Sequence, residues 1–488
     1  MGTFKVAYVH PAPHGRAERS RVPLDAFQNQ PAGLTCALNN LVRSGTELVG
    51  INEAIELRLD PSFALQDWLK RQAPDLVLVE LHWYVHTHGA RRAARMAKTA
   101  LPRVPVVMGG LTATAFSAEI LLRWPVVDMV LAGEVDAPLS MLVQQIRSGS
   151  PLDAVPNLWR RHGESTIPPE RAWCAETLDG LDHVDMGWLE HLEDFERSDL
   201  PYRNRWLLTG RGCPHSCFFC GGSRPGLARL FGRERVLVRP PDHVAADIVR
   251  LARTGVEAVH LTHDLFSVDD QYWRSLFDVV RSSGVTVGLA NESWGPVPGD
   301  DLLEAWAATF DVARSYIALS PTSAWSGLAA LASKRTVLNE LFHALDTMAS
   351  LRFPLHVFFL LNIPGETPRT FERTIDLASA ILQRYPGELL RLEAQPASVD
   401  PGSPAAMGLT KRFRFQPPTL DDYLAVSSGE YVMSLNWPLE ESNVDPGEPL
   451  GVMPAKPREI MALASRCPSF ADRWRDLLRV AQRDKPAG

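Results

Sequence analysis

Short apolar runs alternate with helical stretches along the first 150 residues of the chain. The apolar runs predict strands over residues 5–9, 47–51, 75–81, 104–108 and 127–132. Helical spacing of apolar residues predicts helices between most of these strands, as at residues 26–43 and 88–99. This alternation is typical of a small doubly wound α/β sheet, which binds ligands beyond the carboxyl ends of its strands. We therefore predict a Rossmann-like domain over residues 1–150.

The same alternation returns in the middle third of the chain, over residues 204–400. Strands are predicted over 205–209, 256–262, 285–290, 315–320, 355–361 and 390–397, and helices over 242–254, 269–283, 300–310, 336–351 and 368–384. Gly255 and Gly284 follow two of these helices as stop signals. Strands and helices in this order favour parallel βα units, whose working residues lie at the carboxyl ends of the strands.

Two further segments complete the predicted organisation. Residues 151–203 are rich in Trp, Asp and Glu, and we expect a linker between the two domains. Residues 401–488 match no pattern that we can assign, and we expect substrate specificity to reside in this C-terminal extension. A chain of 488 residues exceeds what one hydrophobic core usually organises, which agrees with a division into several domains.

Three of the six cysteines, Cys213, Cys217 and Cys220, lie within eight residues directly after the first strand of the middle third. Three thiolates at this spacing can hold one [4Fe-4S] cluster, and without a fourth nearby cysteine one iron stays open. A structural zinc site needs four ligands, and the only local candidate, His215, lies inside the same short loop. Six cysteines in 488 residues also argue against a disulfide framework.

Composition and charge narrow the class of protein further. Hydrophobic residues make up 45% of the chain and charged residues 22%, as in ordinary globular proteins. A net charge of −7 gives no reason to expect a nucleic acid partner. No apolar run reaches the roughly 18 residues that a membrane helix needs, so no membrane partner is expected. The N-terminus shows no secretory pattern, and the reducing cytoplasm is the expected location, which also suits an oxygen-sensitive cluster.

The pattern Cys-x-x-x-Cys-x-aromatic-Cys, with Phe219 as the aromatic residue, resembles the signature of the radical S-adenosylmethionine (radical SAM) enzymes. In that family three such cysteines hold a [4Fe-4S] cluster, and the amino and carboxylate groups of SAM bind its open iron. The resemblance implies a partial (β/α)6 barrel over residues 204–400. It also implies that SAM is cleaved to a 5′-deoxyadenosyl radical, which abstracts a hydrogen atom from the substrate.

Residues at several predicted strand ends resemble SAM-binding elements of that family. They are His263 and Asp264 after the second strand, Ser320 at the end of the fourth, Arg335 downstream of it, and Asn362, Pro364 and Gly365 in the turn after the fifth. Two of these positions depart from the family's pattern, because His263 replaces an acidic residue and Asn362 replaces a glycine. Pro364 and Gly365 also suit the turn before a helix. Arg335 equally fits a solvated position on a helix surface.

The first domain resembles the cobalamin-binding domain of B12-dependent radical SAM proteins. The matching residues are Gly109, Gly110, Thr112 and Thr114 in one loop, Gly133 and Glu134 in another, and the run His82, Trp83 and Tyr84. Adjacent glycines let the backbone approach a ligand closely. The chain lacks Asp-x-His-x-x-Gly, which implies cobalamin bound without its own base and without a protein histidine below the cobalt. It also lacks GxGxxG and GxxxxGK[ST] in this domain, which gives nucleotide phosphate binding little support.

Residues 81–88 contain three histidines, His82, His86 and His88, which could instead bind a metal ion. Their spacings of four and two residues do not place all three on one helical face, so we favour a loop that packs against the corrin or the domain interface. The other cysteines, Cys36, Cys174 and Cys467, are expected to be ordinary packed thiols.

The sequence therefore predicts a cobalamin-dependent radical SAM enzyme with a [4Fe-4S] cluster, SAM and cobalamin as cofactors. The most fitting reaction is transfer of a methyl group from methylcobalamin to an unactivated carbon of a small-molecule or natural-product substrate. An electron donor of the flavodoxin or ferredoxin type is expected as a partner. The alternatives are a radical rearrangement, a cyclisation or C–S bond formation, and a non-catalytic Fe–S protein. The pattern names no residue as a general acid or base.

Overall fold

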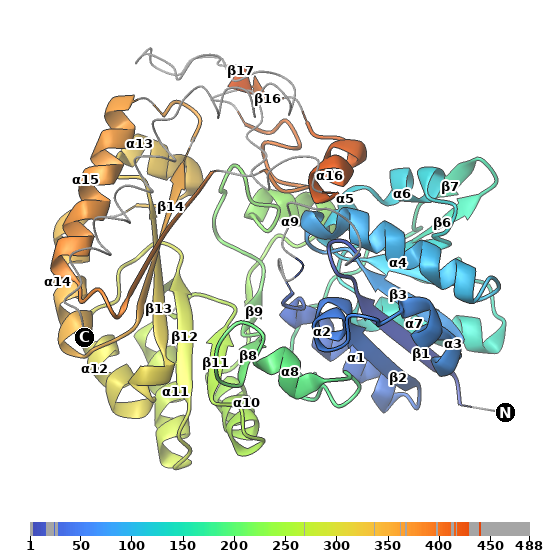
Figure 1. Ribbon diagram of the computed structural model, residues 1–488, viewed down its shortest axis with the longest axis horizontal. Coiled ribbons are helices and arrows are strands. Elements are labelled where there is room, and N and C mark those ends of the chain that lie inside the picture. The colour runs from blue at the N-terminus through green and yellow to red at the C-terminus, as the bar shows by residue number, and fades with distance from the viewer. Residues whose placement is uncertain are drawn as a thin grey trace.

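Two α/β domains lie side by side, with the cysteine-bearing segment between them (Figure 1). The computed structural model describes residues 3–15, 24, 28–267, 269–335, 337–361, 363–366, 368–396, 399–410, 414–415, 417–428 and 439–440. Within these ranges, no helix has the length and apolar character that crossing a membrane requires.

The first domain contains a parallel sheet with the strand order β2-β1-β3-β4-β5. The strands are β1 (Lys5–His10), β2 (Glu47–Asn52), β3 (Leu76–Glu80), β4 (Val106–Gly109) and β5 (Met129–Leu131), and all five were predicted. Two antiparallel strands, β6 (Leu158–His162) and β7 (Ser165–Ile167), extend the sheet beyond β5. Part of the segment expected to be a linker therefore belongs to this sheet.

Helices cover both faces of the first sheet, as in a doubly wound fold. Buried side chains of α1 (Ala32–Arg43) and α7 (Asp136–Ser148) pack on one face, and those of α3 (Leu65–Gln72), α4 (Thr87–Ala100) and α6 (Ser117–Arg123) pack on the other. Pro31 occupies the N-cap of α1, so this helix begins later than predicted, and residues 25–27 lie outside the described residues. Shorter helices are α2 (Glu53–Leu59), η1 (Tyr84–His86), α5 (Leu111–Ala115) and α8 (Leu192–Glu196).

The second domain is an open sheet of six parallel strands in the order β15-β14-β13-β12-β11-β8. The strands are β8 (Asn204–Leu207), β11 (Ala258–Leu261), β12 (Gly288–Ser293), β13 (Tyr316–Thr322), β14 (Leu355–Leu361) and β15 (Leu390–Pro396). Between them run α10 (Pro241–Arg253), α11 (Asp270–Ser282), α12 (Asp300–Thr309), α14 (Leu338–Ser350) and α15 (Pro368–Arg384). These elements match the predicted alternation in number and order.

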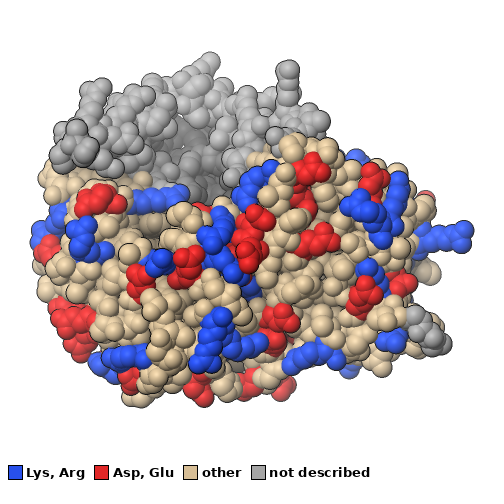
Figure 2. All heavy atoms as spheres, turned by 60° about the horizontal axis from the view of Figure 1, so that its bottom comes forward, with Lys and Arg blue, Asp and Glu red and all other residues tan. Residues whose placement is uncertain are grey.

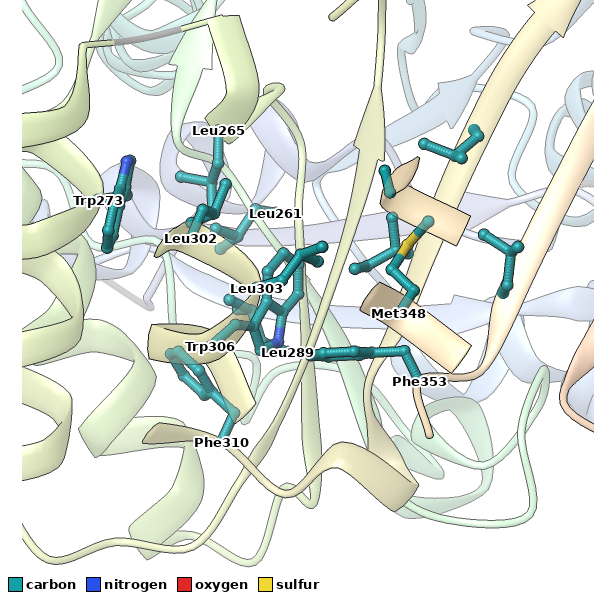
Figure 3. Packing of buried hydrophobic residues seen from close by; sticks show 14 of the residues in the cluster. Leu261, Leu265, Trp273, Leu289, Leu302, Leu303, Trp306, Phe310, Met348 and Phe353 are labelled. Atoms are coloured by element: carbon teal, nitrogen blue, oxygen red, sulfur yellow. The ribbon is translucent and has the colours of Figure 1, made fainter. Parts of the chain in front are cut away.

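The core of the second domain lies between its sheet and these five helices. Trp306 of α12 packs against Phe353 and against Phe310, which directly follows this helix, and Leu289 of β12 lies close to them (Figure 3). Aromatic side chains bury large apolar areas, so this cluster contributes much of the hydrophobic stabilisation of the domain. The short elements η2 (Leu265–Ser267), η3 (Val312–Arg314), α13 (Ser326–Ala329) and η4 (Ala330–Ala332) lie in loops between strands and helices.

A small excursion follows β8 and carries the three cysteines. It contains the antiparallel pair β9 (Gly210–Arg211) and β10 (Leu237–Val238), with α9 (Arg224–Phe231) between them. Residues 399–410 return to this excursion after β15. They lead to β16 (Arg414–Phe415) and α16 (Leu420–Ser427), while β17 (Leu439–Glu440) pairs with β16.

Helix α16 packs on the first domain, although it follows the second domain in the chain (Figure 1). The Ser427 hydroxyl accepts a hydrogen bond from the His88 backbone N–H at 2.8 Å. On the face shown in Figure 2, basic and acidic side chains intermingle across the described surface, in keeping with a modest net charge of −7.

Candidate functional site

A cavity of about 910 Å³ is lined by residues that follow the strands of both sheets. On the first domain it reaches Tyr8 of β1 and the ends of β3, β4 and β5. The strand order reverses between β1 and β3, and such switch points are the usual ligand sites of doubly wound sheets. On the second domain it reaches the ends of β8, β11, β12, β13 and β14. One cavity therefore touches the working edge of both domains.

The loop that carries the cysteines begins with a tight backbone turn at Gly212. This residue has φ +95°, and a Cβ there would lie 2.9 Å from the Arg235 carbonyl oxygen, so only glycine fits without strain. His263 Nε2 lies 2.8 Å from the Gly212 carbonyl oxygen, where it can donate a hydrogen bond. These contacts fix the start of the loop, and Cys213, Cys217 and Cys220 all line the cavity.

Two other segments hold the cysteine loop from opposite sides. On one side Ser216 N–H donates to Ser333 Oγ at 2.9 Å, and Phe218 N–H donates to the Leu331 carbonyl at 3.1 Å. On the other side residues 399–410 contribute two bonds, from Asp400 N–H to the Phe219 carbonyl at 2.8 Å and from Ala405 N–H to the Phe218 carbonyl at 2.9 Å. The loop is therefore held before any metal binds.

Burial raises the pKa of all three thiols, most strongly at Cys220. Lys334, which also lines the cavity, opposes this rise at Cys213 and Cys217. A buried thiolate needs a cationic partner, and iron is such a partner. Among the described cysteines, Cys36 and Cys174 do not line the cavity, so the donor set that the cavity offers is three thiols.

Only some of the residues predicted to contact SAM line the cavity. Phe219, His263 and Ser320 line the cavity, whereas Pro364 and Gly365 lie outside its lining and Arg335 is exposed to solvent. Asp264 is buried, and its carboxylate accepts hydrogen bonds from the backbone N–H groups of Phe266 at 2.7 Å and Trp294 at 2.8 Å. Asn362 falls outside the described residues.

Further residues line the barrel side of the cavity, among them Glu292, Trp294 and Lys334. Ser320 Oγ donates to Glu292 Oε1 at 2.7 Å, and Trp294 lies beside His263 with ring centroids 5.1 Å apart. Lys334, rather than its neighbour Arg335, faces the cavity. Trp294 was not predicted as a site residue, although its position directly after the third barrel strand is the signal that could have identified it.

Most of the residues predicted to contact cobalamin lie in or behind the lining on the first domain. His82, Trp83, Gly109, Gly110, Gly133 and Glu134 line the cavity. Thr112 and Thr114 lie behind it and bind backbone instead: Thr112 Oγ1 donates to the His82 carbonyl at 2.9 Å, and Thr114 Oγ1 accepts from Gly133 N–H at 2.9 Å. The two threonines thus hold the three predicted segments together. Tyr84 packs on Tyr423 of α16, with ring centroids 5.2 Å apart.

An apolar slot extends the cavity into the first domain, between the sheet and helices α1 and α7. It is lined by Tyr8, Leu34, Leu78, Val107, Leu131 and Leu139. The sequence did not reveal this slot, because its residues come from four strands and two helices that only the tertiary fold brings together. A flat apolar group fits such a space better than a charged one does.

The histidine side chains of residues 81–88 do not converge on one site. His82 lines the cavity, His86 packs edge-to-face on His10 with centroids 5.0 Å apart, and the His88 backbone binds α16. Within the described ranges, no three His, Cys, Asp or Glu side chains converge closely enough to hold a single metal ion.

Comparison with known proteins adds a family and a fold. Residues 207–378 match the model of the radical SAM superfamily. The chain is 23% identical over 299 residues to the anaerobic magnesium-protoporphyrin IX monomethyl ester cyclase of Synechocystis sp., covering 60% of this chain and 55% of that protein. It is 24% identical over 305 residues to the hopanoid C-3 methylase of Methylococcus capsulatus, covering 60% of this chain and 52% of that protein. The chain thus spans about half the length of these relatives.

A solved structure resembles nearly the whole chain. TsrM from Kitasatospora setae, a radical S-adenosylmethionine methyltransferase solved with cobalamin and a [4Fe-4S] cluster bound, has a TM-score of 0.63. The likeness covers 96% of this chain and 90% of TsrM at 14% sequence identity. At this identity the likeness concerns the fold, and it confirms the predicted order of a Rossmann-like domain followed by a partial barrel.

Proposed function

We propose that this chain, whose residues 207–378 belong to the radical SAM superfamily, is a cobalamin-dependent radical SAM methyltransferase that acts on carbon of a small molecule. The observation that carries the proposal is that one cavity joins three cysteines of the barrel to the glycine loops and the apolar slot of the first domain. In the proposed reaction one cofactor activates the substrate and the other donates the methyl group, so both must contact the same substrate. Similarity to hopanoid C-3 methylase and to the fold of TsrM supports the same conclusion.

The barrel side of the cavity suits a [4Fe-4S] cluster with SAM beside it. Cys213, Cys217 and Cys220 supply three thiol ligands, which leaves one iron for SAM. The Lys334 ammonium is placed to pair with the SAM carboxylate, and the Ser320–Glu292 pair offers hydrogen-bonding groups for the ribose or the amino group.

The residues that line the cavity on the first domain would hold cobalamin, and the resemblance described above implies that its base would not lie on cobalt. The backbone at Gly109, Gly110 and Gly133 leaves room for the corrin edge, because none of these residues has a side chain to fill the cavity. The apolar slot offers the displaced base a place away from water, since six of its lining residues are apolar or aromatic.

When bound, the cluster and SAM supply an adenosyl radical and cobalamin supplies a methyl carrier. The chain's own residues bind these groups, orient them and exclude water. Trp83 and Trp294 line the cavity from opposite domains with large rings, and Phe358 and Leu360 line its barrel side. Apolar walls of this kind exclude water, which would protect a carbon radical from side reactions.

We further propose two partners. The substrate is a small molecule or natural product, in keeping with a cavity of about 910 Å³ and a net charge of −7. The electron for SAM cleavage comes from a protein of the flavodoxin or ferredoxin type.

A test that needs no substrate measures both halves of the proposal. The protein is reconstituted anaerobically with iron, sulfide and hydroxocobalamin, desalted, and given dithionite with methyl-labelled SAM. We expect about one cobalamin per chain after desalting, formation of 5′-deoxyadenosine, and label recovered in the cobalamin fraction.

Each failure of this test points to a different alternative. Formation of 5′-deoxyadenosine without label on the cobalamin would contradict methyl transfer and favour a rearrangement, a cyclisation or C–S bond formation. Absence of both products, with a cluster spectrum that SAM does not change, would favour a non-catalytic Fe–S protein.

A further inference from the structure

Two arginines and two carboxylates form a buried cluster where the domains meet. Glu134 and Asp136 come from the first domain, after β5 and at the start of α7, and Arg211 and Arg233 come from the cysteine-bearing excursion of the second. Their side chains are only 8%, 5%, 11% and 5% exposed, respectively. We call these four residues the interdomain clamp.

Arg211 and Asp136 form the first pair of the clamp. The guanidinium donates to Asp136 Oδ2 at 2.5 Å and to Asp136 Oδ1 at 2.8 Å. Burial alone would raise the pKa of Asp136, yet the hydrogen bonds and charge of Arg211 hold it below its ordinary value, so the carboxylate stays ionised. Two parallel bonds between planar groups fix orientation as well as distance.

Arg233 and Glu134 form the second pair. Arg233 Nε donates to Glu134 Oε1, and a terminal nitrogen donates to Oε2 at 2.9 Å. Glu134 Oε2 also accepts from Arg211 at 3.0 Å and from the Ala175 backbone N–H at 2.9 Å. The carboxylate predicted to touch cobalamin is thus engaged by the protein itself, and it joins both arginines into one network.

Each end of the clamp lies next to a residue proposed to hold a cofactor. Arg211 is separated from Cys213 only by Gly212, whose backbone is tightly confined. Glu134 directly follows Gly133, which lines the cavity. A shift of the clamp would therefore move the cysteine loop relative to the glycine loops, and hence one cofactor site relative to the other.

We propose that the interdomain clamp sets the spacing between the cluster site and the cobalamin site, with Arg211, Arg233, Glu134 and Asp136 as positioning residues. This inference rests on the proposed function for the identity of the two cofactors. The clamp itself is a property of the chain and can be measured without them.

The matched control is the Arg239–Asp247 pair, which lies wholly within the barrel domain. Arg239 donates to Asp247 Oδ2 at 2.5 Å and to the Leu208 carbonyl at 2.7 Å, and the two side chains are 5% and 9% exposed. Arg239→Met therefore breaks an arginine–aspartate pair of similar burial, joined by one hydrogen bond rather than two, without removing a residue of the clamp. Asp136→Asn serves as a milder clamp variant, because it keeps the shape of the side chain. It replaces Arg211→Met in the measurements if that variant does not fold.

The first measurement is hydrogen–deuterium exchange of the apoprotein. We expect Arg211→Met and Asp136→Asn to raise exchange in residues 211–222 and also in residues 134–142 by about tenfold or more, because the broken network spans both segments. Arg239→Met should leave residues 134–142 at the wild-type rate. Unchanged exchange in residues 134–142 of both clamp variants would overturn the clamp, whatever the cofactors are.

The second measurement is the electron spin relaxation of cob(II)alamin beside the dithionite-reduced cluster in reconstituted protein. We expect the clamp variants to retain both cofactors but to change the relaxation rate, which depends steeply on the distance between the two spins, while Arg239→Met keeps the wild-type rate. Wild-type relaxation in both clamp variants would overturn the positioning role. If wild-type protein binds no cobalamin, the proposed function fails, and the exchange measurement still decides the clamp.

Discussion

The two parallel sheets of this protein bury their faces differently. In the first domain helices cover both faces, and β3 is buried along its whole length. In the second domain five helices cover one face, and the other face carries rings in mutual contact. Trp206, His260, Tyr316 and His356 form this row, with successive centroids 4.9, 5.1 and 4.4 Å apart.

This difference determines where each domain can meet a ligand. A sheet covered on both faces offers its carboxyl edge and the crevice at its switch point. A partial barrel adds the inner face, where Tyr316 and Ser320 belong to the same strand, β13. The first domain is therefore suited to clasp a ligand from one edge, whereas the second can surround one.

The largest expected effect separates the cofactor sites of the two domains. Cys217→Ala removes one of three thiols from the cavity, and we expect SAM cleavage to fall by about a thousandfold or more, because a cluster with two protein ligands is poorly held. Cobalamin retention, a property of the first domain, should stay near the wild-type level. Iron content, 5′-deoxyadenosine and the cobalamin absorbance after desalting check both statements.

The control for this variant is Cys174→Ala, since Cys174 lies outside the cavity lining. Loss of SAM cleavage in Cys174→Ala, or wild-type cleavage in Cys217→Ala, would contradict the assignment of the thiols.

The next effect acts on the first domain alone. Gly110 has φ +115°, and a Cβ there would lie 2.6 Å from the backbone of Leu81 and His82. Gly110→Ala should therefore destabilise this domain by about 3 kcal/mol and abolish cobalamin retention, while the cluster content of the barrel persists. Thermal unfolding and absorbance of reconstituted protein measure the two effects.

Gly149→Ala is the matched control, because Gly149 has φ +65° but nothing lies within 4 Å of its would-be Cβ. It isolates the backbone cost of about 1 kcal/mol from the steric clash. Equal losses in the two variants would show that the close approach at Gly110 has no role.

A smaller effect comes from the inner face of the barrel, and it depends on pH. Burial lowers the pKa of His260 to about 3, whereas the unfolded chain has a histidine pKa of about 6.5. Between these values the unfolded state binds more protons, so stability is full above pH 6.5 and falls on acidification by up to about 1.4 kcal/mol per pH unit. His260→Phe should flatten this part of the stability curve, as followed by urea unfolding between pH 7 and 5. An unchanged slope would place the acid sensitivity elsewhere.

The smallest effect is expected at an ion pair on the outside of the barrel. Arg384 and Asp346 bind each other on neighbouring helices, but both side chains are about half exposed. Solvent screens such pairs, so Arg384→Ala should leave the unfolding temperature within about 1 °C of the wild type. A larger drop would mean that the helix layer depends on surface charge as well as on its apolar core.

The strands of both domains could be read from the sequence because buried parallel strands are continuous apolar runs. The pattern failed at β6, where Arg160 and Arg161 interrupt the apolar run, although the strand pairs with β5 at the sheet edge. It also began α1 too early, because Pro31 sets the start of that helix and periodicity does not register this limit.

The cysteines could be identified from spacing alone, since a loop of eight residues brings its own thiols together. Contacts that depend on the tertiary fold could not be identified from spacing. Spacing did not show that Glu134 and Asp264 bind groups of the protein itself, or that Lys334 rather than Arg335 faces the cavity. The apolar slot was missed for the same reason, as its walls come from distant parts of the chain.

The segment of residues 399–410 has a consequence for how the protein matures. It forms one wall of the cysteine loop through Asp400 and Ala405, yet the ribosome makes it after both sheets. Domains generally fold in the order of their synthesis, so among the described parts of the site this wall is added last. Before residues 399–410 dock, the cysteine loop lacks this wall, so iron and sulfide reach it more easily than they do afterwards. We therefore expect cluster insertion to be easiest before residues 399–410 dock on the cysteine loop.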